Sequence, residues 1–345
     1  MKILYEQKGF PILQNRVYDS AVEAKNCPKG DLRIIEDHKT GLVYNHAFDS
    51  TRMLYDANYN NEQSFSPYFR NHLEEVVKII KSTLGTESLI EVGCGKAYFL
   101  ELLIDYGFDI SGFDSTYEGN NPLVIKKNFE PGIISVPAKG LVLRHVLEHI
   151  PNPYEFLEQL CEANGGGLIY IEVPCLDWII RKKAWFDIFY EHVNYFRSID
   201  FERMFGLIID KGSFFGGQYQ YIVADLASLK KPTFDHLNEV SFPENFLSKI
   251  NLAEECRPLC AWGAASKGVI FSLLAMRQRM KLDYIIDVNP SKQGKFLPVS
   301  GLEVISPKSA MKFLPNEASI FVMNSNYFRE IKDMSENRFN YIKID

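Results

Sequence analysis

The sequence predicts an α/β protein built around a doubly wound, mostly parallel sheet. Short apolar runs that fit strands alternate with amphipathic helical patterns from about residue 70 to residue 225, and such alternation places helices on both faces of a parallel sheet. The alternation begins again near residue 259, after a linker at 230–243. The chain is therefore expected to contain a second, smaller α/β unit. Its length of 345 residues allows two or three domains.

The central unit is expected to open with a helix over 69–84, because Leu73, Val76, Val77 and Ile80 recur at helical spacing after a Ser-Pro start. Strands are predicted over 88–92, 108–113, 141–147 and 168–173, helices over 98–106 and 154–161, and late hairpin strands around 216–224. Each strand is short and apolar, as strands buried between two layers of helices are.

The second unit is predicted from a strand at 259–262, a turn of small residues at 263–268, a helix at 269–276 and strands at 284–287, 319–324 and 341–344. Residues 1–65 are rich in Asn, Asp, Tyr and Gly with little periodicity, which indicates an irregular or small-strand lobe. The expected domains are therefore 1–68, 69–228 and 229–345.

The composition is that of an ordinary globular protein, with 46% hydrophobic and 24% charged residues. A net charge of −6 disfavours non-specific nucleic-acid binding, which depends on cationic contacts to phosphate. Charge appears too early for a signal peptide, and no apolar run approaches the length of a membrane span. We expect a cytoplasmic monomer or homodimer with a small-molecule substrate and neither a nucleic-acid nor a membrane partner.

Six scattered cysteines are expected to be reduced thiols. Cys256 and Cys260 form a CxxxC pair with no second pair nearby, so two small residues on one helical face are expected rather than metal ligands.

The first chemical signal is a glycine turn between a predicted strand and a predicted helix. Gly93 and Gly95 allow a ligand to approach the backbone, and Glu91 favours a cationic group there. Asp114 ends the next strand, where a carboxylate can accept both hydroxyls of a ribose. The third glycine of a dinucleotide fingerprint is missing, so a nicotinamide dehydrogenase is the least expected reading. A tight turn without any ligand remains an alternative.

A second signal follows the strand at 141–147. His145, Glu148 and His149 formally match an inverted zinc-protease motif, which requires a helix. A strand precedes these residues and two prolines follow, so we expect no zinc there. Ligands of doubly wound sheets lie at the carboxyl ends of strands, which makes Glu148 and His149 candidates for a pocket. A structural histidine is the alternative.

The third signal is the stretch 186–196, which places a base, carboxylates and phenols close together. His192 lies next to Glu191, and a neighbouring carboxylate can raise the pKa of a histidine or fix its tautomer. The alternative is an amphipathic surface helix.

These motifs resemble known families. Glu91, Gly93, Gly95 and Asp114 match in order and spacing the first two motifs of class I methyltransferases that use S-adenosylmethionine, and this resemblance covers about residues 70–225. The stretch 186–196 resembles the YHEHxxYF signature of C-methyltransferases that act on nucleotide-linked 4-keto-deoxysugars. Residues 262–268 and 287–298 resemble that family's GYGAxxKG and DxNPxKQGxxxPG motifs, which extends the resemblance to about residues 40–310.

The resemblance implies a class I, Rossmann-like methyltransferase domain over 69–228 and S-adenosylmethionine as cofactor. The implied cofactor-binding residues are Glu91, Gly93, Gly95, Asp114, Phe129 and Glu148. The implied reaction is C-methylation at C3 of the sugar, in deoxysugar, surface-polysaccharide or natural-product biosynthesis. His192 would remove the acidified proton, Glu191 would orient His192 or contact the sugar, and His149 and Tyr195 would donate to the enolate oxygen.

The C-terminal domain is expected to bind the nucleotide diphosphate. Gly263 permits close backbone approach, and Ser266 and Lys267 can donate to phosphate. A turn that serves packing alone is the alternative. The implied substrate-binding residues also include Tyr190, Asn194 and Lys292.

Two departures from the family pattern matter. The family's N-terminal lobe usually carries a four-cysteine zinc site, but this chain has no CxxC pair and has Asp37-His-Lys-Thr40-Gly41 in place of the second. We therefore predict no metal. Phe189 stands where the signature has Tyr, and Tyr190 where it has His, which leaves the substrate open. An O- or N-methyltransferase and a non-catalytic cofactor-binding protein remain the alternatives.

Overall fold

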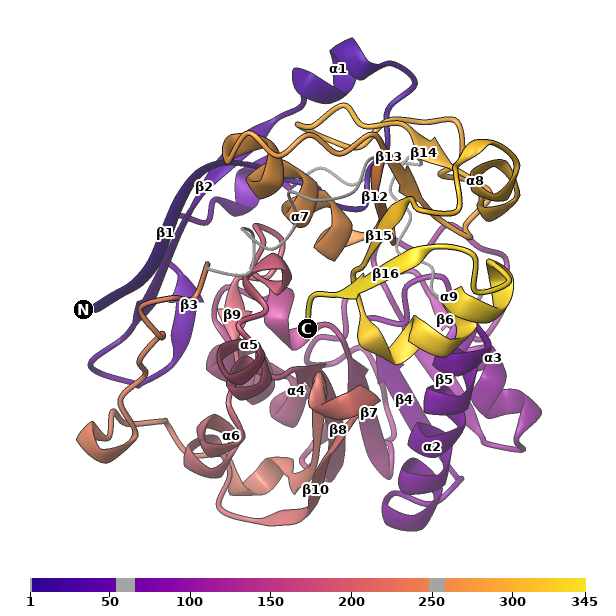
Figure 1. Cartoon of the computed structure of the whole chain (residues 1–345). Helices are drawn as coiled ribbons and strands as arrows, with labels where there is room; N and C mark the ends of the chain where they lie inside the picture. Colours follow the sequence, from indigo (N-terminus) through magenta and orange to yellow (C-terminus); the bar gives the residue numbers. More distant parts are fainter. Residues whose placement is uncertain (1, 54–65, 248–257) are drawn as a thin grey trace.

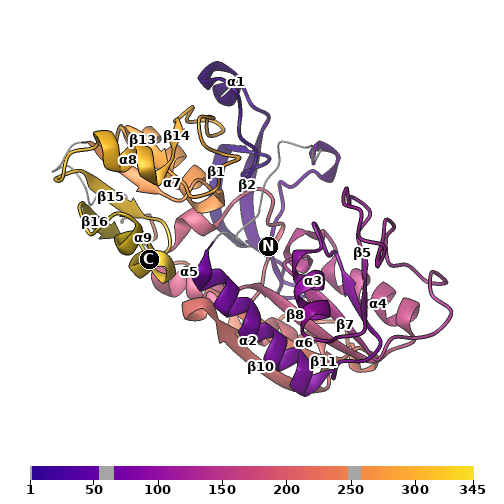
Figure 2. The same cartoon turned by 90° about the vertical axis from the view of Figure 1, so that its right-hand side faces the viewer.

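A computed structural model describes residues 2–53, 66–247 and 258–345 of the chain. It contains three sheets among these residues (Figure 1). Figure 2, turned by 90°, shows the C-terminal elements on one side of the molecule and the central sheet on the other, with the N-terminal strands β1 (Lys2–Pro11) and β2 (Lys29–Glu36) near both. Cys256 of the CxxxC pair lies outside the described residues.

The central sheet confirms the predicted doubly wound α/β unit. Its strand order is β10-β11-β8-β7-β4-β5-β6, parallel from β8 to β6 and antiparallel at β11 and β10. The strands are β4 (Leu89–Val92), β5 (Ile110–Phe113), β6 (Val124–Ile125), β7 (Gly140–Arg144), β8 (Leu168–Pro174), β10 (Ile208–Phe214) and β11 (Tyr219–Asp225). Strand β7 ends three residues earlier than predicted, because the backbone turns into a short 3-10 helix, η2 (Leu147–His149).

Among the described residues, five helices accompany the central sheet, and the first three confirm the helices predicted over 69–84, 98–106 and 154–161. They are α2 (Pro67–Thr83), α3 (Tyr98–Asp105), α4 (Pro153–Asn164), α5 (Leu176–Lys182) and α6 (Ser198–Met204). Helix α2 begins at the Ser-Pro signal, where the Ser66 side chain accepts from the Phe69 N–H. Its apolar face, which includes Leu73 and Val77, is buried against the sheet.

The N-terminal lobe is more regular than expected. Strands β1, β2 and β3 (Val43–Asn45) form an antiparallel sheet, with the short helix α1 (Ala21–Lys25) between β1 and β2. The fourth strand of this sheet is β9 (Asn194–Tyr195), which comes from the chemically rich stretch 186–196. The lobe is therefore hydrogen-bonded directly to the predicted catalytic segment.

The C-terminal unit is a second parallel sheet, in the order β14-β13-β12-β15-β16. Its elements are β12 (Leu259–Trp262), α7 (Ser266–Arg277), β13 (Tyr284–Ile286), β14 (Val304–Ile305), α8 (Pro307–Phe313), β15 (Ser319–Val322), α9 (Phe328–Met334) and β16 (Asn340–Lys343). The remaining 3-10 helices are η1 (Ser50–Arg52), η3 (Trp185–Asp187), η4 (Phe215–Gly217), η5 (Leu226–Ser228), η6 (His236–Asn238) and η8 (Ser325–Tyr327).

One hydrophobic core joins all three parts of the chain. Phe10 of the N-terminal lobe, Trp185 of η3 and Phe271 of α7 are buried in the same cluster, and the Trp185 and Phe271 rings stack at a centroid distance of 5.7 Å. Because these side chains come from all three predicted domains, their burial fixes the domains against one another. The exact domain boundaries stay a prediction.

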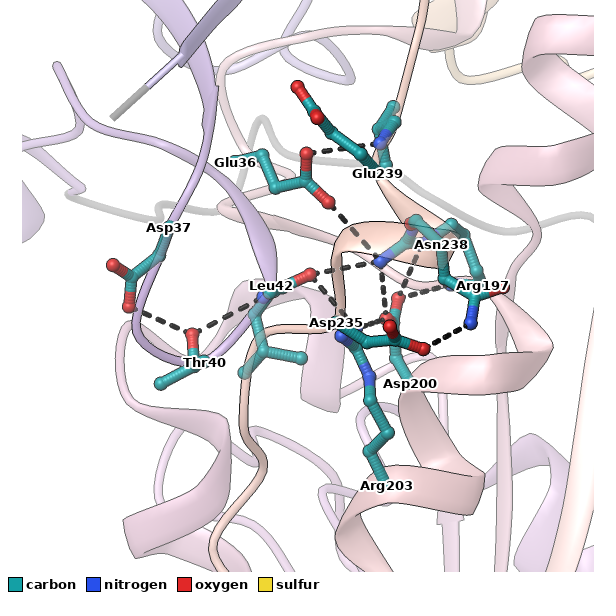
Figure 3. Close-up of polar contacts among 12 residues, drawn as sticks. Glu36, Asp37, Thr40, Leu42, Arg197, Asp200, Arg203, Asp235, Asn238 and Glu239 are labelled. Atoms are coloured by element: carbon teal, nitrogen blue, oxygen red, sulfur yellow. Dashed lines mark hydrogen bonds and ion pairs between the residues drawn. The ribbon is translucent and has the colours of Figure 1, made fainter.

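The turn that stands in place of the family's second CxxC is closed without cysteines (Figure 3). Asp37 accepts from the Lys39 N–H at 3.1 Å and from the Thr40 hydroxyl at 2.8 Å. The Gly41 carbonyl accepts from Arg197 and from Arg203, each at 2.9 Å. Buried guanidinium groups thus hold this turn against the central unit.

Candidate active site

The glycine turn lies at the carboxyl end of β4, as predicted. Gly93 has φ 73° and Gly95 has φ 54°, which side chains other than glycine rarely adopt. A Cβ at Gly93 would lie 2.5 Å from Val146, whereas one at Gly95 would meet nothing within 4 Å. The backbone is therefore open at Gly95. Asp114, at the end of β5, accepts from the Gly95 N–H at 2.8 Å and holds the turn.

Glu91 is a buried carboxylate with unused hydrogen-bonding capacity. It is 4% exposed, and its Oε2 atom has no hydrogen-bond partner. Burial raises its pKa to about 7, although nearby Arg144 acts to lower the pKa. A buried acceptor without a partner is costly, so a ligand that carries an ammonium or sulfonium group fits this position.

Phe129 lies in the core next to β5, the strand that Asp114 follows. It is 4% exposed and packs edge-on against Phe113, with ring centroids 5.0 Å apart. Its contact with an adenine ring stays a prediction.

His145, Glu148 and His149 do not lie on an α-helix, since the described backbone passes from β7 into η2. The zinc-protease arrangement is therefore absent from this stretch. His145 Nδ1 is 3.3 Å from Glu148 Oε1, and its Nε2 is 3.2 Å from Glu172 Oε1. Burial alone would lower the pKa of His145, but the two carboxylates raise it to about 9. Both ring nitrogens then carry protons at neutral pH.

The predicted catalytic segment is buried and mostly irregular, so the alternative of a surface helix is wrong. Two contacts attach the segment to η2: the Val193 N–H donates to the Glu148 carbonyl at 2.8 Å, and His149 Nδ1 donates to the Glu191 carbonyl at 2.7 Å. A third attaches it to the N-terminal sheet, where the Asn45 N–H donates to the Val193 carbonyl at 2.7 Å.

His192 is 9% exposed and lies among aromatic rings. Its ring centroid is 3.9 Å from that of Phe189 and 5.1 Å from that of His149. Burial, with smaller contributions from His149 and His145, holds its pKa well below 6.5. The imidazole is therefore neutral at pH 7 and able to accept a proton.

The Glu191 side chain is held by the N-terminal lobe. Its Oε1 accepts from the Gln14 N–H at 2.5 Å, and the Glu191 N–H donates to Gln14 Oε1 at 3.4 Å. Asn15, the next residue, donates to Ser266 Oγ at 3.1 Å and accepts from Lys292 Nζ at 3.4 Å. All three parts of the chain thus meet beside Glu191.

Sequence reasoning missed Gln14 and Asn15. Both are buried, at 0% and 3% exposure. The one available signal was two amides next to the apolar residues Ile12 and Leu13, and that signal does not name a partner.

Three residues predicted to take part in catalysis or substrate binding form hydrogen bonds within the segment 186–196 or with its neighbours. The Tyr195 hydroxyl donates to the Phe189 carbonyl at 3.0 Å and accepts from the Phe189 N–H at 3.2 Å. The Tyr190 hydroxyl accepts from the Asp49 N–H at 2.9 Å. Asn194 Nδ2 donates to the Ile150 carbonyl at 2.5 Å. In this structure the three side chains stabilise the conformation of the segment. Their contacts with substrate stay predictions.

The turn at 263–268 also serves packing. A Cβ at Gly268 would lie 1.8 Å from the Gly263 carbonyl oxygen, so the start of α7 can approach the turn because residue 268 has no side chain. Lys267 Nζ is 3.4 Å from Asp187 Oδ2 and 4.8 Å from the centroid of the Trp178 ring. Lys267, which the sequence predicts to bind phosphate, therefore lies between α7 and η3 in this structure.

Glu148, His149 and His192 form a compact group. One ligating atom from each lies within 4.8 Å of the others, a spacing that a metal ion also accepts. The prediction that this site holds no metal stays a prediction.

No helix in the described ranges is both long and apolar enough to cross a lipid bilayer. The cytoplasmic location stays a prediction.

Comparisons with known proteins address the family of this chain. A family model described as a methyltransferase domain matches residues 61–207, and a model described as a C-methyltransferase C-terminal domain matches residues 244–340. The search of curated proteins gave no match.

Solved structures similar to the chain include the methyltransferase domain of bacterial CtHen1-CN, with 17% identity, a TM-score of 0.37 and coverage of 46% of this chain and 98% of that one. Another is the magnesium protoporphyrin IX methyltransferase of Synechocystis PCC 6803 with bound SAH, with 15% identity, a TM-score of 0.36 and coverage of 50% and 90%. A third is the plantazolicin methyltransferase BpumL with SAH, with 15% identity, a TM-score of 0.36 and coverage of 49% and 88%.

The two family models follow one another along the chain, with residues 208–243 between them, and agree with the glycine turn, the unpartnered Glu91 oxygen and the second α/β unit. This chain is therefore an S-adenosylmethionine-dependent methyltransferase that carries a C-methyltransferase C-terminal domain.

Proposed function

We propose that the enzyme methylates a carbon atom, C3, of a nucleotide-linked 4-keto-deoxysugar. The observation that carries this proposal is the neutral, buried His192, whose neighbour Val193 is hydrogen-bonded to η2 and to the N-terminal sheet. The C-methyltransferase C-terminal domain supports the same kind of acceptor atom. Such a reaction belongs to deoxysugar biosynthesis for surface polysaccharides or natural products.

The residues around the glycine turn fit the cofactor. Glu91 Oε2 is a buried acceptor without a partner, and the space at Gly95 is open to a ligand. Asp114 already accepts from the Gly95 N–H, and the further lone pairs of a carboxylate can accept ribose hydroxyls. When bound, S-adenosylmethionine supplies an electrophilic methyl group on a positively charged sulfur.

The acceptor carbon needs a base, because a C–H bond next to a ketone is only weakly acidic. We assign this role to His192, whose neutral ring can take the C3 proton and leave the electron pair on the enolate. Burial strengthens every electrostatic interaction that stabilises the enolate oxygen.

His149 is the better placed of the two predicted donors to that oxygen. Its Nδ1 proton is given to the Glu191 carbonyl, so His149 donates through Nε2 when it carries a second proton. The hydroxyl proton of Tyr195 is engaged by the Phe189 carbonyl.

The C-terminal domain is proposed to bind the nucleotide portion of the substrate. Ser266 and Lys292 support this, since both lie at the junction with Asn15 beside Glu191. For Lys267 to contact phosphate, its ion pair with Asp187 must first break.

The test is an incubation with S-adenosylmethionine labelled in its methyl group and with dTDP- or GDP-linked 4-keto-6-deoxyhexoses. We expect label in the carbon skeleton of the sugar and deuterium exchange from solvent at C3. Label on oxygen or nitrogen without such exchange would identify an O- or N-methyltransferase instead.

The variant His192→Asn tests the base. A placed general base contributes about 10²- to 10⁴-fold in rate, so turnover should fall by about that factor. The affinity for S-adenosylhomocysteine, measured by calorimetry, should stay within about twofold, because the cofactor loop lies on a different strand. Turnover at the wild-type rate would remove His192 from the mechanism.

A further inference from the structure

The Glu148 side chain lies close to the imidazole rings of His149 and His192. One of its carboxylate oxygens lies within 4.8 Å of a ring nitrogen of His192 and of a ring nitrogen of His149. Glu148 is 1% exposed, and its backbone carbonyl accepts from the N–H of Val193, the residue after His192. Backbone and side chain of Glu148 are thus both fixed beside His192.

A contact with His145 orients the Glu148 carboxylate. Its Oε1 lies 3.3 Å from His145 Nδ1, while Oε2 is buried and has no hydrogen-bond partner. The other ring nitrogen of His145 lies 3.2 Å from Glu172, which Arg144 and His72 also contact at 2.9 Å. This charged network occupies one oxygen of Glu148 and leaves the other unused.

An unused carboxylate oxygen matters here because His192 must become a cation when it takes a proton. Burial, His149 and His145 each disfavour a charge on His192. The other titratable neighbour in ring contact is Tyr195, with centroids 6.3 Å apart. Glu148 brings the opposite charge into this group.

We propose that Glu148 is the positioning partner of His192, and that its carboxylate stabilises the imidazolium formed during proton removal. In that step the C3–H bond breaks, an N–H bond forms on His192, and the electron pair remains on the enolate. The proton later passes to solvent. This inference rests on the proposed function, and it assigns Glu148 to the base instead of the cofactor.

Glu191 is the neighbour of His192 in sequence but does not occupy this position. Its Oε1 accepts from the Gln14 N–H at 2.5 Å, and its charge acts on the buried ammonium of Lys292. The structure therefore gives Glu191 a place in the junction between lobes.

The first experiment needs no substrate. In the full-length protein, histidine ring signals are followed by NMR between pH 4 and pH 8, and His192→Asn identifies the His192 signal. Removing a carboxylate at this range should weaken the protonation of His192 in Glu148→Gln by about tenfold. Glu91→Gln, which removes a buried carboxylate from the neighbouring strand end, serves as the matched control and should leave the His192 titration unchanged. An unchanged titration in Glu148→Gln would overturn the inference.

The second experiment measures the proton-transfer step. Deuterium exchange at C3 of dTDP-4-keto-6-deoxyglucose is followed with S-adenosylhomocysteine present. We expect Glu148→Gln to slow exchange by about 10- to 100-fold with an unchanged affinity for S-adenosylmethionine. The reverse pattern, normal exchange with at least about tenfold weaker cofactor binding, would make Glu148 a cofactor ligand and overturn the inference.

A metal ion in the same group gives a separate signature. Loss of exchange in the wild-type enzyme on chelation, with recovery on adding Zn²⁺ or Mg²⁺, would assign the three side chains to the metal and also overturn the inference. If the wild-type enzyme exchanges no keto-sugar at all, the proposed function fails, while the NMR titration still decides the role of Glu148.

Discussion

At the scale of single residues, Glu91 is a buried carboxylate that lowers the stability of the folded state. The carboxylate is buried with an unpartnered oxygen, and its pKa of about 7 lies above the ordinary value of 4.5. Between these two pH values the folded protein keeps the Glu91 proton and the unfolded chain loses it. The folded state is therefore progressively destabilised by this group as pH rises from 4.5 to 7.

The substitution Glu91→Gln should separate stability from binding. A shift of this size corresponds to about 3 kcal/mol, so the variant should be more stable than wild type at pH 8 by up to that amount and similar at pH 4.5. Chemical unfolding at the two pH values measures this. An equal stability difference at both would contradict the assigned pKa.

The same variant should bind S-adenosylmethionine more weakly at pH 8, because it lacks the negative charge. In the wild-type protein the affinity should fall as pH drops through about 7, where Glu91 takes up its proton. Calorimetry across pH 6 to 8 should show this slope in wild type and its absence in Glu91→Gln. A slope that persists in the variant would point to another group.

At the scale of elements, the ends of neighbouring strands bring the site together. Strands β4 and β7 are paired in parallel, so Glu91 and the η2 residues lie at the same edge of the sheet. The backbone turns sharply after β7, where His145 has φ 52°. That left-handed conformation is rare for a residue other than glycine and is expected where a site requires it.

Helix α6 shows how the N-terminal turn is attached without cysteines. Arg197 and Asp200 are paired at 2.9 Å, with side-chain exposures of 6% and 0%. Arg203 also pairs with Asp200 (Figure 3), and both arginines donate to the Gly41 carbonyl. These charges satisfy one another inside the protein.

Removing one partner leaves a buried charge uncompensated. The variant Asp200→Asn should therefore lose about 3 to 5 kcal/mol of unfolding free energy. Glu202→Gln, on the same helix, is the matched control: its ion pair with Lys211 is exposed, so a change below about 1 kcal/mol is expected. Urea unfolding of both variants gives the comparison. Equal losses would show that burial of the Asp200 network does not matter.

At the scale of the whole molecule, the lobes are joined where the predicted catalytic segment, 186–196, is held. Asn15 links the N-terminal lobe to Ser266 and Lys292 of the C-terminal unit, and Gln14 holds Glu191. Displacing catalytic groups by about 1 Å can cost about 10²-fold in rate. Contacts between the lobes can thereby control turnover.

Asn15→Ala should lower kcat by about tenfold and leave the affinity for S-adenosylhomocysteine unchanged. Lys2→Ala provides the control, because the ion pair of Lys2 with Glu239 also joins distant segments but is exposed. Steady-state kinetics of both variants test this. A loss of cofactor affinity in Asn15→Ala, or equal effects of the two substitutions, would contradict a specific junction.

The N-terminal lobe should fold without zinc. Its turn at 37–41 is closed by Asp37, Thr40 and the arginines of α6. Incubation with a chelator should leave the Tm unchanged, whereas a structural zinc site would lose folding free energy. Metal analysis of the purified protein provides a second measurement, and one bound zinc per chain would refute the prediction.

Much of the fold could be predicted because it depends on local patterns. The strand–glycine–helix signal at Glu91 to Tyr98 and the helical spacing of α2 follow from short-range periodicity and backbone sterics. The N-terminal sheet could not be predicted, because its fourth strand, β9, lies about 150 residues further along the chain and its pairing is set by tertiary contacts.

The sequence by itself determined the doubly wound sheet, the cofactor turn and the chemical types of the site residues, since each is encoded within a few neighbouring positions. The tertiary structure alone decided which partner each polar group has. The Glu191 carboxylate accepts from Gln14, the Tyr195 hydroxyl donates to Phe189, and the Glu148 carboxylate lies beside His192. Hydrogen bonds and desolvation act through space, so their outcome depends on which distant residues packing brings together.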